Sequence, residues 1–271
     1  MIKIDGLYKI TNEKITPPHC PSFSGIVAGQ CKGDLWVDNA EYPTVAIANS
    51  YPVGGFAFLG EIRSQETYNT ILAFVYEELF PLLKLRKIDC FEFSIESENL
   101  RKHVLEMFST ESIQSEKEFH YRKNERYPKQ INLPEQYSVH EVNSELWNLI
   151  KERKIENQEM LTERILGSWE SIDDFFNKSL AFCIMCVDKI VAVIVGTARF
   201  NRYIAIDIAT EEEHRKKSLG QILTQTFVNE CIERGLLPQW SCVESNLASR
   251  KLVEKANFKF LKQNDVYWFN I

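Results

Sequence analysis

Residues 210–221 read Thr-Glu-Glu-Glu-His-Arg-Lys-Lys-Ser-Leu-Gly-Gln, and the character of the C-terminal half follows from this stretch. A strand-like run, Tyr203–Ile208, precedes it, and a helix-like run with a periodic apolar stripe begins at Leu219. The sequence therefore predicts a strand, a tight basic turn and a helix in direct succession. Because the first N–H groups of a helix have no partner inside it and carry a partial positive charge, we expect an anion such as a phosphate to bind at this turn.

The elements around this turn predict a mixed α+β fold for residues 137–271. In chain order we expect a strand at 137–142, helices at 144–151 and 157–177, strands at 180–187, 190–200 and 203–210, a helix from 219 that stops at Gly235, a strand at 236–243, a helix at 247–256, and a final strand pair at 258–261 and 266–269. Asp188-Lys189 is the expected two-residue turn between two of these strands. The sheet is expected to be mostly antiparallel and flanked by helices, because hairpins come first and a β-α-β crossover follows.

The N-terminal half echoes this order. Residues 96–108, which begin Glu-Ser-Glu-Asn-Leu, resemble residues 244–254, which begin Glu-Ser-Asn-Leu, and each follows a helix-like and then a strand-like run. The polar segment 124–136 contains two prolines and is the expected linker. We therefore divide the chain into an N-terminal α/β domain, 1–127, interpreted as a degenerate related module, and a C-terminal domain, 128–271. Where the second half has its basic turn, the first has Gly60-Glu61-Ile62-Arg63-Ser64, which is a poor cradle for pyrophosphate.

Composition limits the classes of partner. The chain has 271 residues and a formal net charge of −6, which argues against nucleic acid as a partner. It shows no signal-peptide pattern at its start and no apolar run of membrane-spanning length, so we expect a cytoplasmic protein without a membrane partner, and leave a homodimer open. The seven cysteines have no disulfide spacing and the five histidines no ligand spacing, so no metal is predicted.

The C-terminal half resembles the GNAT superfamily of N-acetyltransferases. The family's loop, [Q/R]-x-x-G-x-[G/A], corresponds to Arg215-x-x-Ser218-Leu219-Gly220, with serine in place of the first glycine. The later signature N-x-x-[A/S] … G-F corresponds to Asn246-x-x-Ser249 … Asn257-Phe258, with asparagine in place of glycine. The run 238–249 is closest to the zwittermicin A resistance-like branch, which also carries a divergent N-terminal half.

This resemblance implies acetyl-CoA as cofactor and a small-molecule amine as acceptor. Its pantetheine arm is then expected to pair with the backbone of Ile208, Ala209 and Thr210. The pyrophosphate is expected on Arg215, Lys216, Lys217, Ser218, Leu219, Gly220 and Gln221, with Asn246 and Ser249 reaching the cofactor from the next helix. The implied reaction is direct attack of a primary amine on the thioester carbonyl.

The catalytic groups are less well defined. Many members of the family have a tyrosine four residues before the glycine of G-F as the acid, and that position here is Val253. Tyr203 or Tyr267 is the alternative donor, unless the thiolate leaves unaided. Asp207 and Glu244 are the candidate bases, each acting through a water molecule.

Two other functions remain open. Val253 and Ser218 favour a non-catalytic module that binds acyl-CoA. The N-terminal half could instead serve as a dimerisation or partner-docking surface. At the level of single residues, Arg215 could simply pair with the preceding glutamates, Asn246 could be an ordinary helix N-cap, and Asp207 an exposed charge on a strand.

Overall fold

The computed structural model describes residues 1–6, 15–129, 131–152 and 154–271. These form two compact units, and each contains residues from both halves of the sequence. Unit 1 comprises Met1–Phe119, Val243–Ser245 and Gln263–Ile271, and unit 2 comprises His120–Cys242 and Asn246–Lys262. The predicted division into domains 1–127 and 128–271 stays a prediction. Residues 120–127 group with unit 2, and residues 243–245 and 263–271 group with unit 1.

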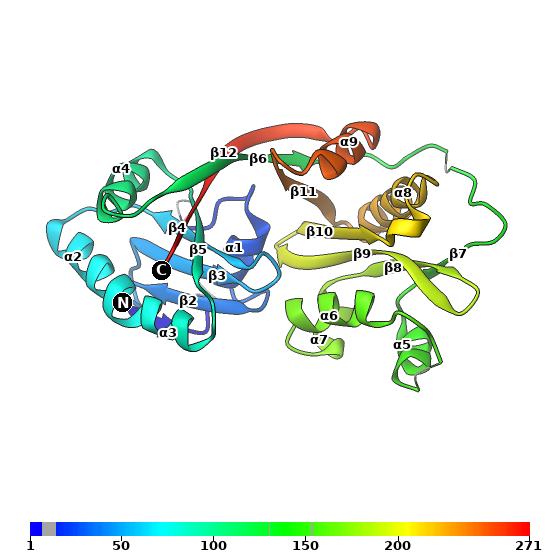
Figure 1. Cartoon of the computed structure of the whole chain (residues 1–271), viewed down its shortest axis with the longest axis horizontal. Helices are drawn as coiled ribbons and strands as arrows, with labels where there is room; N and C mark the ends of the chain where they lie inside the picture. The colour runs from blue at the N-terminus through cyan, green and yellow to red at the C-terminus, as the bar shows by residue number, and fades with distance from the viewer. Residues whose placement is uncertain (7–14, 130, 153) are drawn as a thin grey trace. The chain divides into compact units, whose positions relative to one another are not determined.

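Unit 1 is a helix-flanked sheet (Figure 1). Its elements are β1 (Ile2–Ile4), α1 (Pro21–Val27), β2 (Gly33–Val37), β3 (Val45–Ser50), β4 (Gly55–Gly60), α2 (Gln65–Phe74), η1 (Val75–Leu79), α3 (Phe80–Leu85), β5 (Cys90–Ile95), α4 (Glu98–Met107), most of β6 (Gln114–Arg122) and the end of β12 (Lys259–Asn270). The strand order is β1-β2-β3-β4-β5-β12-β6. β4 pairs with β5 in parallel, and β12 pairs with β5 antiparallel.

Unit 2 repeats this plan. Its elements are β7 (Ser138–Glu141), α5 (Ser144–Lys151), α6 (Glu159–Ser168), α7 (Ile172–Lys178), β8 (Ala181–Cys186), β9 (Lys189–Phe200), β10 (Tyr203–Thr210), η2 (Glu212–His214), α8 (Leu219–Glu233), β11 (Leu237–Val243), α9 (Leu247–Lys255) and the start of β12. The strand order is β6-β11-β10-β9-β8-β7. β7, β8, β9 and β10 pair antiparallel in turn, and β10 pairs with β11 in parallel. The predicted mixed, mostly antiparallel α+β sheet is confirmed.

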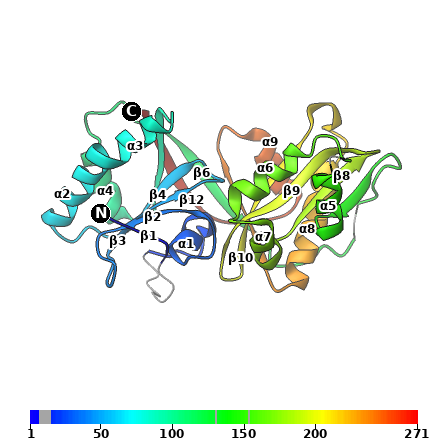
Figure 2. The same cartoon turned by 90° about the horizontal axis from the view of Figure 1, so that it is seen from below.

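Helices cover both faces of the sheet in unit 2. Figure 2 shows α5, α6 and α7 on the near side of the sheet, with α8 and α9 behind it. The α8 face is packed by Leu219, Leu223 and Phe227 against aliphatic side chains of β8, β9 and β10. α8 stops before Gly235 (φ 72°) and α9 before Asn257 (φ 52°), so both predicted left-handed helix ends are present.

The last strand differs from its prediction. The structure has one continuous strand, β12, where the sequence suggested a pair separated by the polar residues 262–265. Those polar residues stay extended because they have partners. The Asn264 side chain donates a hydrogen bond to the Glu96 carboxylate, and the Asp265 carboxylate forms ion pairs with Arg101 and Lys117. Polar composition there reflects ion pairing rather than a turn.

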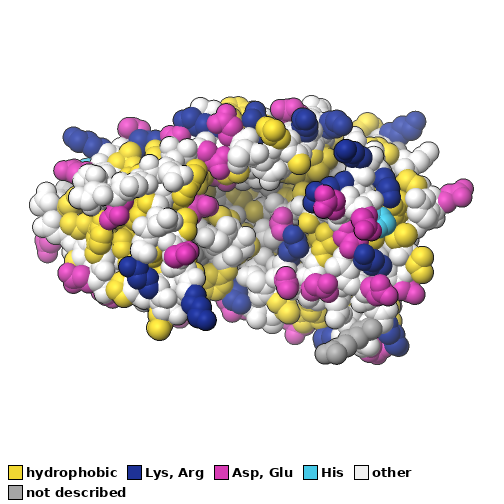
Figure 3. All heavy atoms as spheres, in the orientation of Figure 1, with side chains coloured by type: hydrophobic (Ala, Val, Ile, Leu, Met, Phe, Trp, Pro, Cys, Tyr) yellow, Lys and Arg dark blue, Asp and Glu magenta, His cyan; other side chains and the backbone are white. Residues whose placement is uncertain are grey.

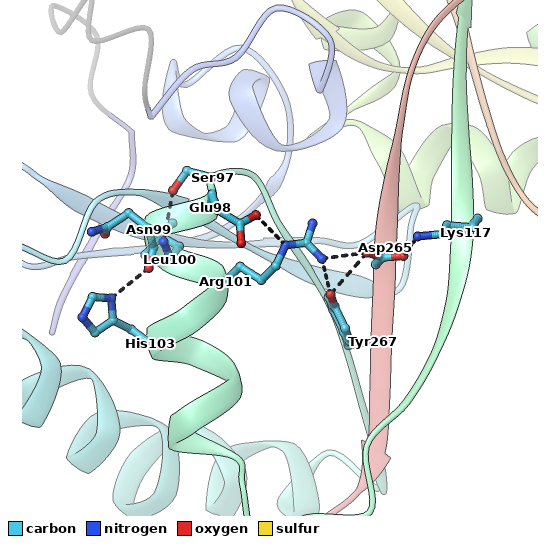
Figure 4. A network of polar contacts seen from close by, with 9 residues as sticks. All are labelled: Ser97, Glu98, Asn99, Leu100, Arg101, His103, Lys117, Asp265 and Tyr267. Carbon is cyan, nitrogen blue, oxygen red and sulfur yellow. Dashed lines mark hydrogen bonds and ion pairs between the residues drawn. The ribbon is translucent and has the colours of Figure 1, made fainter.

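Figure 4 shows this network in unit 1. The Arg101 guanidinium reaches from α4 to the Asp265 carboxylate, 2.7 Å away, and also donates to the Tyr267 hydroxyl. Burial by itself raises the pKa of Asp265, but hydrogen bonds from Lys117 and Arg101 outweigh it and lower that pKa. The network therefore fastens β12 to α4 and β6.

The turn between β8 and β9 lies one residue earlier than predicted. Its central residues are Val187 and Asp188, and Lys189 already pairs with Cys186. Val187 has φ 57°, a conformation that strains a β-branched residue, and it is 83% exposed. The strong pairing of the two flanking strands holds the turn in this register.

The predicted linker 124–136, of which Gln130 lies outside the described residues, is irregular but attached to α8 in unit 2. The Tyr127 N–H donates to the Asn229 side chain at 2.7 Å, and the Ile131 N–H donates to Gln225 at 3.1 Å. Burial raises the pKa of Tyr127 to about 12. This segment is therefore part of the packed unit and not a free tether.

Candidate functional site

The parallel strands of unit 2 separate halfway along β10. β11 pairs with β10 only from Tyr203 to Ala205, and a bulge follows between Ala205 and Ile206. Within the described chain, the second half of β10 pairs with β9 alone. Ile208 and Thr210 therefore present one backbone edge to which an extended ligand can add hydrogen bonds.

The basic turn follows directly after this open edge. The Glu211 N–H donates to the Val191 carbonyl at 2.9 Å, and the short η2 then leads to α8. None of the backbone N–H groups of residues 216–221 donates to a protein oxygen in the part of the chain that the structure describes. They crowd at the N-terminus of a 15-residue helix, where the helix dipole adds positive potential. Such an arrangement binds phosphate groups.

Two residues give the turn its sharp bend. Lys216 (φ 61°) and Ser218 (φ 62°) both adopt the left-handed conformation. The sequence comparison had placed Ser218 where glycine is usual, and the structure confirms that this position needs a positive φ. Alternating left-handed residues turn successive N–H groups toward one side, which forms a concave anion-binding nest.

Gly220 and Leu219 fix the first turn of α8. Leu219 is 1% exposed and anchors the helix in the apolar core. A Cβ on Gly220 would lie 3.2 Å from Leu252 of α9 and 3.8 Å from Ile208 of β10. The absence of a side chain lets the helix end approach both elements, so a large residue here would displace the nest.

Basic side chains surround the nest. Arg215, Lys216 and Lys217 are all exposed, and Figure 3 shows further lysine and arginine side chains over α9, the helix beside α8. Arg215 donates from Nε to the Thr210 carbonyl at 3.2 Å. The alternative in which it pairs with Glu211, Glu212 or Glu213 is not seen, so the rest of its guanidinium faces solvent.

Asn246 and Ser249 both hold the start of α9. The Asn246 side chain accepts a hydrogen bond from the Ser249 N–H at 3.0 Å, which makes it the N-cap. The Ser249 hydroxyl accepts from the Trp240 indole N–H at 2.8 Å. These structural roles still leave the Ser249 O–H proton as a donor toward a ligand.

Asp207 is held in place by a residue that the sequence did not single out. Arg164 of α6 donates from Nε to the Asp207 carboxylate at 2.8 Å, and from a second nitrogen to the Met160 carbonyl at 2.7 Å. Asp207 is thus a positioned half-buried carboxylate on the open part of β10, rather than an isolated surface charge. Nothing local in the sequence links these two residues, which are 43 positions apart.

The other candidate catalytic residues are dispersed. Tyr203 lies at the start of β10, and the Arg122 guanidinium is stacked 4.0 Å from its ring centre. Glu244 is exposed and belongs to unit 1, where its N–H donates to the Lys117 carbonyl at 2.7 Å. Tyr267 also belongs to unit 1, and burial raises its pKa. Val253, at the position of the usual acid, is wholly buried in unit 2.

The described residues contain no group of three or more His, Cys, Asp or Glu side chains arranged to hold a metal ion. Burial raises the pKa of the Cys183 thiol to about 12. Among the same residues, no helix combines the length and apolarity needed to span a bilayer.

Comparison with known proteins extends these observations. The family model for GNAT acetyltransferase matches residues 14–267. The chain is 21% identical over 254 residues to the uncharacterized N-acetyltransferase YdfB of Bacillus subtilis (strain 168), and the match covers 92% of this chain and 91% of YdfB.

Two solved structures share the fold. A GCN5-related N-acetyltransferase-like protein from Streptococcus suis has a TM-score of 0.59 at 18% identity, covering 88% of each chain. A tandem GNAT protein from the clavulanic acid biosynthesis pathway has a TM-score of 0.58 at 12% identity, covering 96% of this chain and 90% of that chain. The family model covers most of the sequence, and the split between β10 and β11 lies beside a turn with unpaired N–H groups. The chain therefore belongs to the GNAT acetyltransferase family and is an acyltransferase.

Proposed function

We propose that the protein transfers an acetyl group from acetyl-CoA to a primary amine of a small molecule. The observation that carries this proposal is the row of unpaired N–H groups at residues 216–221, beside the open edge of β10. A diphosphate joined to an extended arm that contains amides fits these two features together. The diphosphate needs N–H donors gathered at one point, and the arm needs a free strand edge with which its amides can pair.

Different residues would bind different parts of acetyl-CoA. The N–H groups of the nest would hold the pyrophosphate, with charge from Arg215, Lys216 and Lys217. Ile208, Ala209 and Thr210 would pair with pantetheine, while Leu219, Gly220 and Gln221 form the helix end that aims the nest. Asn246 and Ser249 would contact the nucleotide side. When bound, acetyl-CoA supplies a thioester, which is an activated acyl donor.

Asp207 is the proposed base of unit 2. An attacking amine must lose its proton, and the Asp207 carboxylate lies on the open part of β10. Arg164 keeps that carboxylate oriented through Oδ2, which leaves Oδ1 to accept from a water molecule. Tyr203 is the proposed acid from the same strand. Glu244 stays a second proposed base, although it belongs to unit 1.

The family match identifies an acyltransferase, so the non-catalytic acyl-CoA-binding alternative that the sequence left open would require this member of the family to have lost its activity. That alternative is favoured by the buried Val253, which can supply no proton to a leaving thiolate. Release of free thiol from acetyl-CoA in the presence of a mixture of primary amines supports the enzyme. Binding without amine-dependent thiol release supports the non-catalytic alternative.

The donor is tested by thermal stability. Acetyl-CoA at millimolar concentration is expected to raise the Tm, because a ligand that binds only the folded state stabilises it by about 2.7 kcal/mol at one hundred times its Kd. Gly220→Glu should abolish that shift, since the new side chain meets Leu252 and places a negative charge at the nest. Gly167→Glu is the matched control, because Gly167 is exposed on α6 with open space around it. An equal shift in all three proteins would contradict the proposal.

A further inference from the structure

We propose that unit 1 carries a binding site of its own for the ammonium group of a small amine, built by Glu92, Ser50 and Ser94 around Gly55. It lies on the face of the sheet that α1 covers, the face to which Ala48 and Ala57 also contribute. Neither the sequence comparison nor the nest in unit 2 accounts for this group of residues.

The register of three strands brings the group together. Ser50 of β3 lies directly opposite Gly55 of β4. Phe56 of β4 is paired with Phe93 of β5, so Gly55 is the neighbour of Glu92. A Cβ on Gly55 would lie only 3.3 Å from Glu92 Oε1. The carboxylate therefore lies above the glycine, on the side of Ser50, in space that any other residue would fill.

Glu92 is an acid without a counter-charge. Its side chain is half-buried, and in the described part of the chain it makes no ion pair and no hydrogen bond. Burial raises the pKa of Glu92, and the nearby Glu116 carboxylate raises it further. An uncompensated carboxylate in such a place is costly, and a bound cation removes most of that cost.

Two serines add unsatisfied polar atoms to the same face. Ser50 is 0% exposed and Ser94 is 4% exposed, and the hydroxyl oxygen of each has no hydrogen-bond partner among the described residues. Ser94 is two residues from Glu92 on one strand, so both side chains point to one side of the sheet. Buried hydroxyl groups normally have partners, which makes two on one face a sign of a missing ligand.

The chemistry of these groups selects an ammonium. A primary ammonium group has three N–H donors and a positive charge that compensates the Glu92 carboxylate. The N–H groups that do not bond to Glu92 can donate to the hydroxyl oxygens of Ser50 and Ser94. The Glu116 carboxylate, which accepts a hydrogen bond from the Ser245 N–H at 3.0 Å, is near enough to raise the pKa of Glu92 and adds negative potential. An anion is therefore excluded. Water alone could satisfy the serines, but it would leave the charge of Glu92 uncompensated.

The test uses the full-length protein in the absence of acetyl-CoA. The probe is ethanolammonium chloride. Binding is measured by saturation-transfer NMR and calorimetry, with ethylene glycol as the neutral analogue. The wild-type protein should bind ethanolammonium and not the glycol. Glu92→Gln should weaken binding about tenfold or more, because a charge-assisted contact is lost. Gly55→Ala should also weaken it, because the added methyl group displaces Oε1. Glu78→Gln, an exposed acid on η1, is the control and should bind like the wild type.

Stability provides a second readout. If Glu92 is an uncompensated charge, Glu92→Gln should raise the Tm of the ligand-free protein, whereas a structural carboxylate would give a lower Tm. Equal binding of ethanolammonium and glycol, or unchanged binding in Glu92→Gln, overturns the proposal. Because acetyl-CoA is absent, these outcomes are independent of whether the nest in unit 2 binds it.

Discussion

At the scale of single residues, Ser218 shows how a function constrains the backbone. Its φ of 62° is required to turn the N–H groups of the nest, but a side chain in this conformation is strained. The same reasoning applies to Lys216, with φ 61°. Natural sequences keep such strain where a binding geometry depends on it.

Ser218→Gly should therefore stabilise the protein while keeping the nest. We expect the free energy of unfolding to rise by about 1 kcal/mol, since glycine adopts a positive φ without the steric cost. Urea denaturation measures this, and the thermal shift with acetyl-CoA should be preserved. The reciprocal control is Gly235→Ser, at a helix end with φ 72° and open space, which should lose a similar amount. A less stable Ser218→Gly protein would mean that the serine side chain contributes an interaction that outweighs its strain.

At the scale of elements, the end of β12 is fixed by charge. Asp265 lies between Arg101 and Lys117, and the lowered pKa of Asp265 means that the folded state prefers the carboxylate. Its contribution to stability is complete above the unfolded-state pKa of about 3.9 and is lost as the pH falls through the lower folded-state value.

Asp265→Asn should consequently be less stable than the wild type at pH 7, by on the order of 1–2 kcal/mol. The difference should shrink as the pH falls below about 4, because the carboxylate of the unfolded wild-type protein then binds a proton while the folded one, with its lowered pKa, does so only at a lower pH. Urea denaturation at pH 7 and at pH 3 measures both values. Glu98→Gln is the control, because Glu98 contacts Arg101 but is 87% exposed. A difference that does not change with pH would rule out a charge effect.

At the scale of the whole molecule, local signals were readable and distant contacts were not. The nest, the N-cap at Asn246 and the helix end at Gly235 follow from residues adjacent in sequence, and each was predicted. The partnership of Arg164 with Asp207 was not, because it joins two elements that no periodicity relates.

The missed group in unit 1 has the same cause. Glu92, Ser50 and Gly55 come from three strands, and only the register of the sheet brings them together. The continuous β12 was missed because residues 262–265 are polar, and their partners, such as Glu96, lie in the first half of the chain. Sequence pattern reports the environment of a residue, not the identity of its distant neighbour.

Removal of residues 263–271 tests how far unit 1 depends on β12. Tyr267 and Phe269 are buried in its aromatic core, and losing each such side chain costs about 3–5 kcal/mol. The total approaches the free energy of unfolding of an ordinary domain, so unit 1 of the truncated protein should be digested by protease. The control variant Tyr267→Phe, which keeps the aromatic ring, should remain resistant. A truncated protein with wild-type resistance would show that β12 is dispensable.

The place of β12 also bears on how the protein is made. Translation delivers most of unit 1 first, yet the strand that completes its sheet emerges only after the chain of unit 2 has been synthesised. Until then the nascent polypeptide exposes the open edge of β5, with Phe91 and Phe93 beside it. The two units therefore cannot fold to completion one after the other during synthesis. The exposed edge of β5 is the place where a chaperone would protect the nascent chain.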